Sequence, residues 1–202
     1  ALPADARNYR RILKKEIFEP LGMNDTDFWV PEEKQDRLAK VYDCREGQPS
    51  VRYLDNNLGI QNDMAYRPAY EAGGAGLAST IDDYAKFTQM LLNGGTYNGV
   101  QILRPATVKF LGGHTLSAVQ QAGFDNWIGL EGFSYGNLMR VLVDPTRAVT
   151  LGSKGEFGWD GWLGCYMEVV PEQNMTFLMM TQKKDAGTYT LSRKIRNIIF
   201  SE

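Results

Sequence analysis

The hydrophobic pattern of this 202-residue chain changes its period at about Trp127. Upstream, apolar residues recur at helical spacing or are interrupted by long stretches rich in turn residues. Downstream, short apolar runs are separated by tight turns, which is typical of antiparallel strands. Met139 to Val143 and Ala148 to Leu151 are predicted to form one hairpin, and Cys165 to Val170 and Met175 to Thr181 a second. Helices followed by a set of strands is the order of an α+β fold.

Four segments carry helix signals, with long loops and short elements expected between the first two. Their predicted bounds are Asp5 to about Glu19, Thr80 to Leu92, Pro105 to Gly113 and Leu191 to Ile199. Pro20-Leu21-Gly22 ends the first, and Thr80 with Asp83 resembles a capping box at the start of the second. The terminal helix is predicted to pack on the sheet through one apolar side, with basic residues on the other. The apolar side comprises Leu191, Ile195, Ile198 and Ile199, and the basic side Arg193, Lys194 and Arg196.

Composition favours one domain over residues 1–202, with 1–126 mainly helices and loops and 127–202 antiparallel strands and the terminal helix. The chain has 22 basic and 24 acidic residues and no basic run, so no nucleic-acid partner is expected. No apolar stretch approaches the roughly 20 residues that span a bilayer. Because the chain begins at Ala1 in a polar stretch, we expect it to be a portion of a longer protein.

Metal and cofactor motifs are not found in the sequence, so neither is expected. Cys44 and Cys165 match no metal spacing, and both two free thiols and one disulfide remain open. His114 is the only histidine, which narrows the hydrolytic mechanisms that could operate within the chain. No glycine cluster fits a nucleotide-binding loop.

The feature most suggestive of chemistry is the turn Gly158-Trp159-Asp160-Gly161-Trp162. A glycine-flanked turn that leads into a strand can direct a backbone N–H into a cleft, as an oxyanion hole requires. Large aromatic residues are usually core, but the glycines on either side of Trp159 favour a role at a site.

A nucleophile to accompany that turn is not found in the chain. Gly132-Phe133-Ser134-Tyr135-Gly136 fits the GxSxG pattern, but no histidine follows it and the next residues are predicted to form a strand. A glycine-bounded entry to a strand is the preferred interpretation. The chain contains no SxxK, in which the lysine would face the serine one helical turn away. Lys154 directly follows Ser153, and Lys194 lies two positions after Ser192, so neither lysine has the required spacing.

Four motifs, taken in order, resemble one family. They are Ile17 to Met23, Gly73 to Tyr84, Leu91 to Gly95 and Phe157 to Gly161. The family is the serine β-lactamase-related one, which includes class C β-lactamases, D-alanyl-D-alanine peptidases and esterases of the same fold. The resemblance covers essentially the whole chain but only the C-terminal part of such an enzyme. It implies a β-lactamase/transpeptidase-like fold.

The resemblance also implies a set of site residues. Relatives carry an SxxK nucleophile and base motif and a YxN-type motif, both upstream of the segment that matches Pro20 to Met23, and this chain has neither motif in that region. The family's third motif, Lys or His, then Thr, then Gly, is matched by Trp159, Asp160 and Gly161. The backbone N–H of Trp162 would be one oxyanion donor, and the serine's own N–H the other.

By the resemblance, Trp159 and Ala75 favour an esterase-type or undefined acyl substrate. Trp159 lacks the charge with which Lys or His often meets a substrate carboxylate, and some esterase-like members also place Trp there. Gly74 and Ala75 lie in the stretch that borders the pocket in relatives. Class C β-lactamases have Tyr at the position of Ala75, so Ala75 implies a more open acyl pocket.

Two functions follow from these considerations. The first is the C-terminal region of a serine hydrolase that transfers an acyl group from a small ester, amide or β-lactam through a serine acyl-enzyme. The isolated chain would be inactive, and either the N-terminal portion of the same protein or self-association would cover its open sheet edge. The alternative is a non-catalytic module that binds a ligand or partner, which Asp160 in place of Thr favours. The resemblance is compatible with a periplasmic or secreted location.

Overall fold

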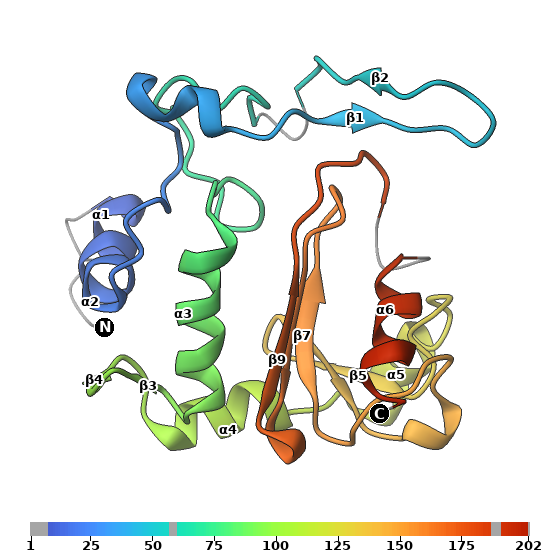
Figure 1. Cartoon of the computed structure of the whole chain (residues 1–202). Coiled ribbons are helices and arrows are strands. Elements are labelled where there is room, and N and C mark those ends of the chain that lie inside the picture. Colours follow the sequence, from blue (N-terminus) through green and yellow to red (C-terminus); the bar gives the residue numbers. More distant parts are fainter. Residues whose placement is uncertain (1–7, 57–59, 187–190, 202) are drawn as a thin grey trace. The chain divides into compact units, whose positions relative to one another are not determined.

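The structure, a computed structural model, describes residues 8–56, 60–186 and 191–201. The chain divides into two compact units, Ala1–Phe87 and Thr88–Glu202. Figure 1 shows the first unit as helices and loops, and the second as an antiparallel sheet with helices. Among the described residues, no helix combines the length and apolar character needed to cross a membrane.

The first unit opens with a helical run whose middle turn is a π-helix. Its parts are α1 (Tyr9–Leu13), a π-helical turn (Lys14–Phe18) and α2 (Glu19–Leu21). Asn8 caps α1, its side chain accepting a hydrogen bond from the backbone N–H of Arg11 at 2.9 Å. The predicted cap, Asp5, lies outside the described residues. The wider turn precedes Pro20, which has no N–H to donate, and the run ends at Gly22 (φ 67°), as predicted.

The remainder of the first unit is mostly loop, as expected for residues 24–70. Its short elements are a 3₁₀ helix (Glu32–Arg37) and the strand pair β1 (Tyr42–Asp43) and β2 (Val51–Arg52). Helix α3 (Ile81–Leu92) begins after Thr80, whose Oγ1 accepts a hydrogen bond from the N–H of Asp83 at 3.2 Å. The Asp83 carboxylate instead accepts from the N–H of Asp25 at 2.6 Å, so it ties α3 to a distant loop.

The second unit contains a five-stranded antiparallel meander in the order β5-β6-β7-β8-β9. Its strands are β5 (Phe133–Gly136), β6 (Met139–Leu142), β7 (Phe157–Asp160), β8 (Tyr166–Val170) and β9 (Met175–Met179). The other elements are β3 (Thr96–Tyr97), β4 (Val100–Gln101), α4 (Pro105–Gly113), α5 (Ala118–Phe124) and α6 (Leu191–Ile199). The hairpin β8-β9 and the helix from Pro105 confirm the predictions within two residues at each end. Together these elements give the predicted α+β fold.

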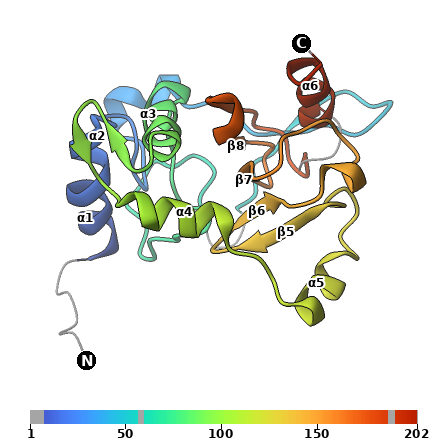
Figure 2. The same ribbon diagram turned by 90° about the horizontal axis from the view of Figure 1, so that it is seen from below.

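Helix α4 packs closely on the sheet, where Figure 2 shows it running beside β5 and β6. A Cβ at Gly112 would lie 2.5 Å from the ring of Phe157, so glycine permits this approach. The core around it is formed by buried apolar side chains, among them Val108, Phe133, Val141, Phe157 and Val169.

The predicted hairpin between Met139 to Val143 and Ala148 to Leu151 is wrong. Met139–Leu142 pairs with β5 and β7, whereas residues 148–151 form no strand. A 3₁₀ turn, Pro145–Arg147, separates them. The N–H of Leu151 donates to the Asn197 side chain at 2.9 Å, and its carbonyl accepts from Arg196 Nη2 at 2.8 Å. Side chains of α6 thus supply the partners that a strand would have supplied.

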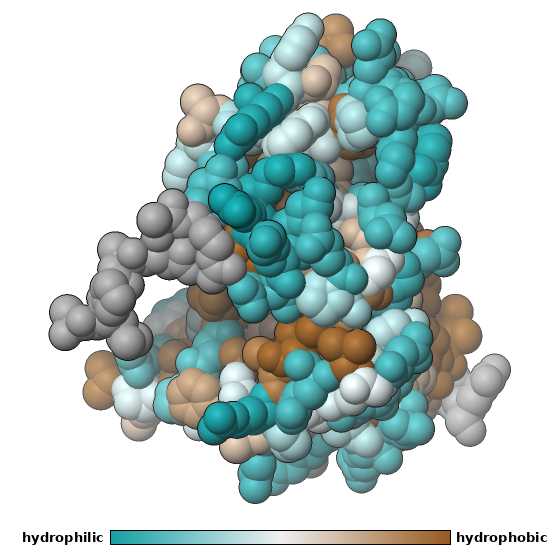
Figure 3. Space-filling model, turned by 90° about the vertical axis from the view of Figure 1, so that its left-hand side faces the viewer, coloured by the Kyte–Doolittle hydropathy of each residue, from teal (hydrophilic) through white to brown (hydrophobic). Residues whose placement is uncertain are grey.

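The predicted orientation of α6 is only partly right, because Lys194 is exposed and Ile195 and Ile199 are half-buried as predicted, but three other residues are not. Arg196, assigned to the solvent side, is 2% exposed, whereas Leu191 and Ile198, assigned to the packed side, are 53% and 64% exposed. The reason is electrostatic, because buried carboxylates of the sheet require a cation and Arg196 supplies it. Large apolar side chains are exposed elsewhere too, and Figure 3 shows a mainly hydrophilic face with an apolar patch in its lower half.

Candidate functional site

The turn that follows β7 is held by its own backbone. The N–H of Gly161 donates to the carbonyl of Cys165 at 2.7 Å, and the N–H of Gly164 donates to the carbonyl of Gly161 at 2.9 Å. Gly164 has φ 83°, and a Cβ there would lie 2.3 Å from Thr181 Oγ1. This segment, Gly161 to Cys165, is called the oxyanion turn below, after its predicted role.

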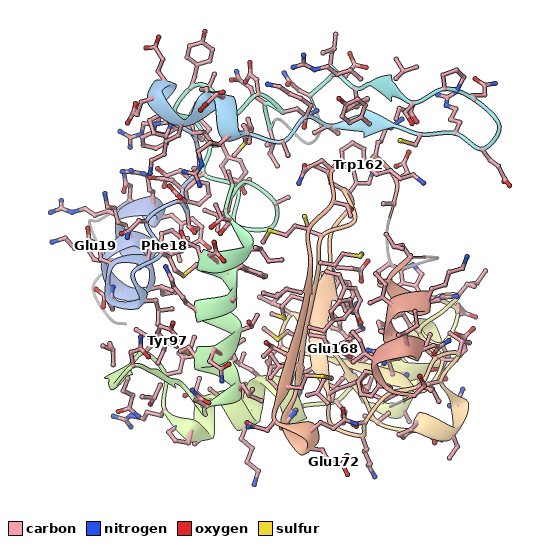
Figure 4. The ribbon with its side chains drawn as sticks, in the orientation of Figure 1. Phe18, Glu19, Tyr97, Trp162, Glu168 and Glu172 are labelled. Carbon is pink, nitrogen blue, oxygen red and sulfur yellow. The ribbon has the colours of Figure 1, made fainter. Side chains whose placement is uncertain are left out.

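The segment after β9 braces the oxyanion turn from outside. Asp185 accepts a hydrogen bond from the indole Nε1 of Trp162 at 2.5 Å. The carbonyl of Leu163 accepts from Thr181 Oγ1 at 2.9 Å and from the N–H of Lys183 at 3.0 Å. Figure 4 shows Trp162 at the end of the sheet opposite to Glu172. Because donors that stabilise an oxyanion must be fixed in advance, this bracing suits the predicted role of the Trp162 N–H.

Trp159 belongs to a cluster of four aromatic rings, Phe124, Trp127, Tyr135 and Trp159, which we call the aromatic cluster. The Trp159 ring lies 5.2 Å from that of Tyr135 in an edge-on arrangement and 6.1 Å from that of Trp127. Phe124 lies 5.8 Å from Trp127 and 6.0 Å from Tyr135. A hollow of about 490 Å³ adjoins the cluster, lined by Leu116, Gln120, Gly123, Phe124, Asn126, Trp127 and Tyr135. The cluster therefore offers a largely apolar wall beside the third motif.

Asp160, the last residue of β7, forms a buried ion pair. Its Oδ1 lies 2.5 Å from Nη1 of Arg140 on β6, and the two side chains are 16% and 3% exposed. The guanidinium carbon of Arg140 lies 4.7 Å from the centre of the Tyr166 ring. Burial disfavours the charge of Arg140, but Tyr166, Asp160 and Glu168 outweigh it, and its pKa is raised.

A second charged group lies behind the site, and we call it the buried ionic cluster: Glu156, Tyr166, Glu168 and Arg196. Arg196 Nη2 donates to Glu156 at 2.6 Å, and Nη1 donates to Glu168 and, at 3.1 Å, to the Tyr166 hydroxyl. Figure 4 shows Glu168 on the side of the sheet that carries α6. Burial and the neighbouring Glu168 raise the pKa of Glu156 to about 8, and burial raises that of Tyr166 to about 12. Near pH 7 the Glu156 carboxyl is therefore mainly protonated.

The predicted site residues fall in both units. Trp159, Asp160, Gly161 and Trp162 are brought together by β7 and the oxyanion turn. Gly74 and Ala75 are exposed in a turn of the first unit. That stretch is anchored near Ala78, whose N–H donates to the carbonyl of Asp27 at 2.9 Å.

A hollow of about 240 Å³ in the first unit is lined partly by charged side chains that are already engaged. Asp25 pairs with Lys34 at 2.5 Å and with Arg37 at 2.9 Å. Hydrogen bonds from Arg37 and Lys34 lower the pKa of Asp25 to about 2. These charged groups are engaged in ion pairs that stabilise a loop. The hollow is therefore a weaker candidate for a substrate site than the aromatic cluster beside β7.

Ser134, considered above as a nucleophile, has a structural role. Ser134 is 2% exposed in the middle of β5, and its Oγ accepts a hydrogen bond from the N–H of Leu116 at 3.0 Å. This is a strand position and not a strained elbow. Cys44 and Cys165 are free thiols, and burial raises the pKa of Cys165. Over the described ranges, no three potential metal-ligating side chains gather.

Comparison with known proteins identifies the family. The model of the family described as Beta-lactamase matches residues 2–198. The chain belongs to the beta-lactamase family. Protein Rv1367c of Mycobacterium tuberculosis is 32% identical over 88% of this chain and 44% of its own length. A putative D-alanyl-D-alanine carboxypeptidase of Escherichia coli is 30% identical over 86% of this chain and 39% of its own length.

The beta-lactamase fold is also found in solved structures. The structure titled EstCE1, a hydrolase with promiscuous acyltransferase activity, superposes with a TM-score of 0.74 at 23% identity. It covers 95% of this chain and 50% of its own. These matches confirm the family and fold that the four motifs indicated. The chain spans less than half the length of the two curated relatives.

Arg140 and the buried ionic cluster were not identified as site residues from the sequence. One signal was available, because Arg140 and Glu168 each interrupt an apolar strand. A charge within a buried strand needs a partner, and counting such charges predicts pairs. The sequence did not indicate which residues would pair.

Proposed function

We propose that this chain is the C-terminal region of a serine hydrolase of the beta-lactamase family that acts on esters with an apolar acyl group. The oxyanion turn supplies one backbone donor, the N–H of Trp162, and the aromatic cluster contacts the acyl group. The nucleophile and its base lie outside the 202 residues. The isolated chain is therefore inactive, and its site is completed by the rest of the same protein.

The observation that carries the proposal is the setting of Trp159. At the position where relatives often use Lys or His, this chain has an indole packed edge-on against Tyr135. The guanidinium of Arg140, 5.8 Å from the Trp159 ring, is paired with Asp160. Because this ion pair has no net charge, it offers no positive charge to a substrate carboxylate, as in a β-lactam or a peptidoglycan peptide. An apolar acyl chain gains by leaving water.

The alternative is a non-catalytic binding module, which Asp160 in place of Thr would favour. Because the Asp160 carboxylate pairs with Arg140, a structural reason accounts for the acidic residue. The substitution therefore no longer argues against catalysis.

A comparison of ester chain lengths tests the role of Trp159. In the full-length protein we expect p-nitrophenyl butyrate to be hydrolysed with a kcat/KM at least about 100-fold above that for nitrocefin. Replacing Trp159 by Lys should lower kcat/KM for the butyrate ester about tenfold, because roughly 50 Å² of apolar contact corresponds to about 1.3 kcal/mol. The acetate ester, with a shorter chain, should lose only about twofold.

Trp29→Phe is the control, since Trp29 lies in the first unit and contacts Arg10 instead. It should leave both ester rates unchanged. Nitrocefin turnover that equals ester turnover, or a Trp159→Lys variant with an unaltered ratio of butyrate to acetate, would contradict the proposal.

A further inference from the structure

We propose that Arg140 is a positioning residue for the oxyanion turn and acts through Asp160. The inference rests on the proposed function, because it assigns a role within that same site. Asp160 is the residue immediately before Gly161, so a force on its side chain acts on the start of the oxyanion turn. Arg140 is buried, with only 2% of the residue exposed.

The pair is placed by sheet register. Arg140 lies opposite Gly158 across β6 and β7, and Asp160 lies opposite Tyr166 across β7 and β8. Residues 158 and 160 share a face of the strand, so the carboxylate and the guanidinium meet on that face. Their separation is 2.5 Å. The hydrogen bond thus joins β6 to the last residue of β7, where the pairing of β6 with β7 has already ended.

Arg140 is also anchored on its far side. Its guanidinium lies over the ring of Tyr166, whose hydroxyl donates to Glu168 at 3.1 Å and accepts from Arg196 at 3.1 Å. A continuous set of contacts therefore runs from Asp160 through Arg140 to the buried ionic cluster. An anchored guanidinium can restrain Asp160, whereas an exposed, flexible one could not.

Asp160 is the main acceptor available to Arg140. The second terminal nitrogen, Nη2, is buried and has no hydrogen-bond partner within the part of the chain that the structure describes. Removing the Asp160 carboxylate would therefore leave a buried cation without its principal partner. Conversely, removing Arg140 would leave the Asp160 carboxylate unpaired at the start of the oxyanion turn, and its hydration would favour a movement toward water.

Displacement of that carboxylate would reach the reaction through backbone geometry. Oxyanion donors contribute most when they are fixed where charge develops, and small misplacements are costly. A positioning role therefore predicts a loss in kcat with little change in KM. A group that bound substrate directly would instead raise KM.

The experiment compares variants of the full-length protein by kinetics and by amide hydrogen exchange of the peptide 158–166. Arg140→Met should lower kcat for p-nitrophenyl butyrate about 100-fold and leave KM within about threefold. Exchange in 158–166 should become at least about tenfold faster. Arg140→Lys keeps the charge but loses the planar fork, and should lower kcat by about tenfold at most. If Arg140→Met does not fold, the Arg140→Lys variant still tests the proposal.

The matched control is Arg147→Met, which removes an exposed arginine 3.8 Å from Asp125 in the same unit. Its kcat and its exchange in 158–166 should equal those of the wild type. A folded Arg140 variant with faster exchange but unchanged kcat would overturn the inference, and so would a raised KM with unchanged kcat. A wild type that hydrolyses no ester would count against the proposed function, and unchanged exchange in Arg140→Met against this inference.

Discussion

Replacing Arg196 by Met is expected to destabilise the protein by about 3–5 kcal/mol. The substitution leaves Glu156 and Glu168 buried without their shared cation, at 0% and 2% exposure. Neither carboxylate can reach water without movement of α6 or β8. Urea unfolding of the full-length protein, followed by circular dichroism, measures the loss.

The control for this prediction is Lys194→Met, because Lys194 lies on the same helix and is exposed. It should change the unfolding free energy by less than about 0.5 kcal/mol. The loss in Arg196→Met should also grow as the pH rises. Burial raises the folded-state pKa of Glu156 to about 8, from its usual 4.5, so the stability associated with its protonated form is complete below pH 4.5 and lost through pH 8. Arg196 lowers this pKa, so its removal makes ionisation of the buried carboxyl more costly as the pH rises. Equal stability of Arg196→Met and Lys194→Met would contradict the account of the buried ionic cluster.

Replacing Gly158 by Ala is expected to cost at least about 3 kcal/mol. A Cβ at this position would lie 2.0 Å from the carbonyl oxygen of Met167 and 2.9 Å from the Cα of Glu168. Both contacts are with the backbone of β8, so no side-chain rotation relieves them. Thermal unfolding should show a correspondingly lower Tm, and the two strands must separate if the variant folds at all.

Gly161→Ala is the matched control for Gly158→Ala, because a Cβ there meets nothing closer than 3.8 Å. Its stability should stay within about 1 kcal/mol of the wild type. Packing within the fold therefore does not explain why residue 161 is glycine. Under the proposed function, a substrate bound over the oxyanion turn would explain it. A folded Gly161→Ala variant that loses ester hydrolysis supports that reason. Equal destabilisation by the two substitutions would refute the steric argument.

Features set by local sequence were predicted well. The stop at Gly22, the start at Thr80 and the hairpin of β8 and β9 depend on residues close together in the chain, and each was confirmed. Such features follow from backbone preferences that need no tertiary partner. The turn predicted over Gly158 to Trp162 is only partly right, because residues 158–160 belong to β7 and the turn closed by short hydrogen bonds begins at Gly161.

Features set by pairing over long distances were not predicted. Arg196 has the sequence spacing of a solvent-facing residue, but two carboxylates 40 and 28 positions away draw it inward. Residues 148–151 have a strand-like composition, yet α6 satisfies the backbone of Leu151. Arg140 and Asp160 are 20 positions apart, and only the register of β6 and β7 brings them together. A single sequence does not show which of its distant residues pair in the fold.

The most direct test of the account is to find the serine that carries the acyl group. The full-length protein is treated with a fluorophosphonate probe, digested and mapped by mass spectrometry, alongside the isolated 202-residue chain. We predict one adduct, on a serine outside these residues, suppressed by prior incubation with p-nitrophenyl butyrate, and no adduct on the isolated chain. An adduct on Ser134 or another serine of the chain, or an unlabelled full-length protein, would contradict the central claim.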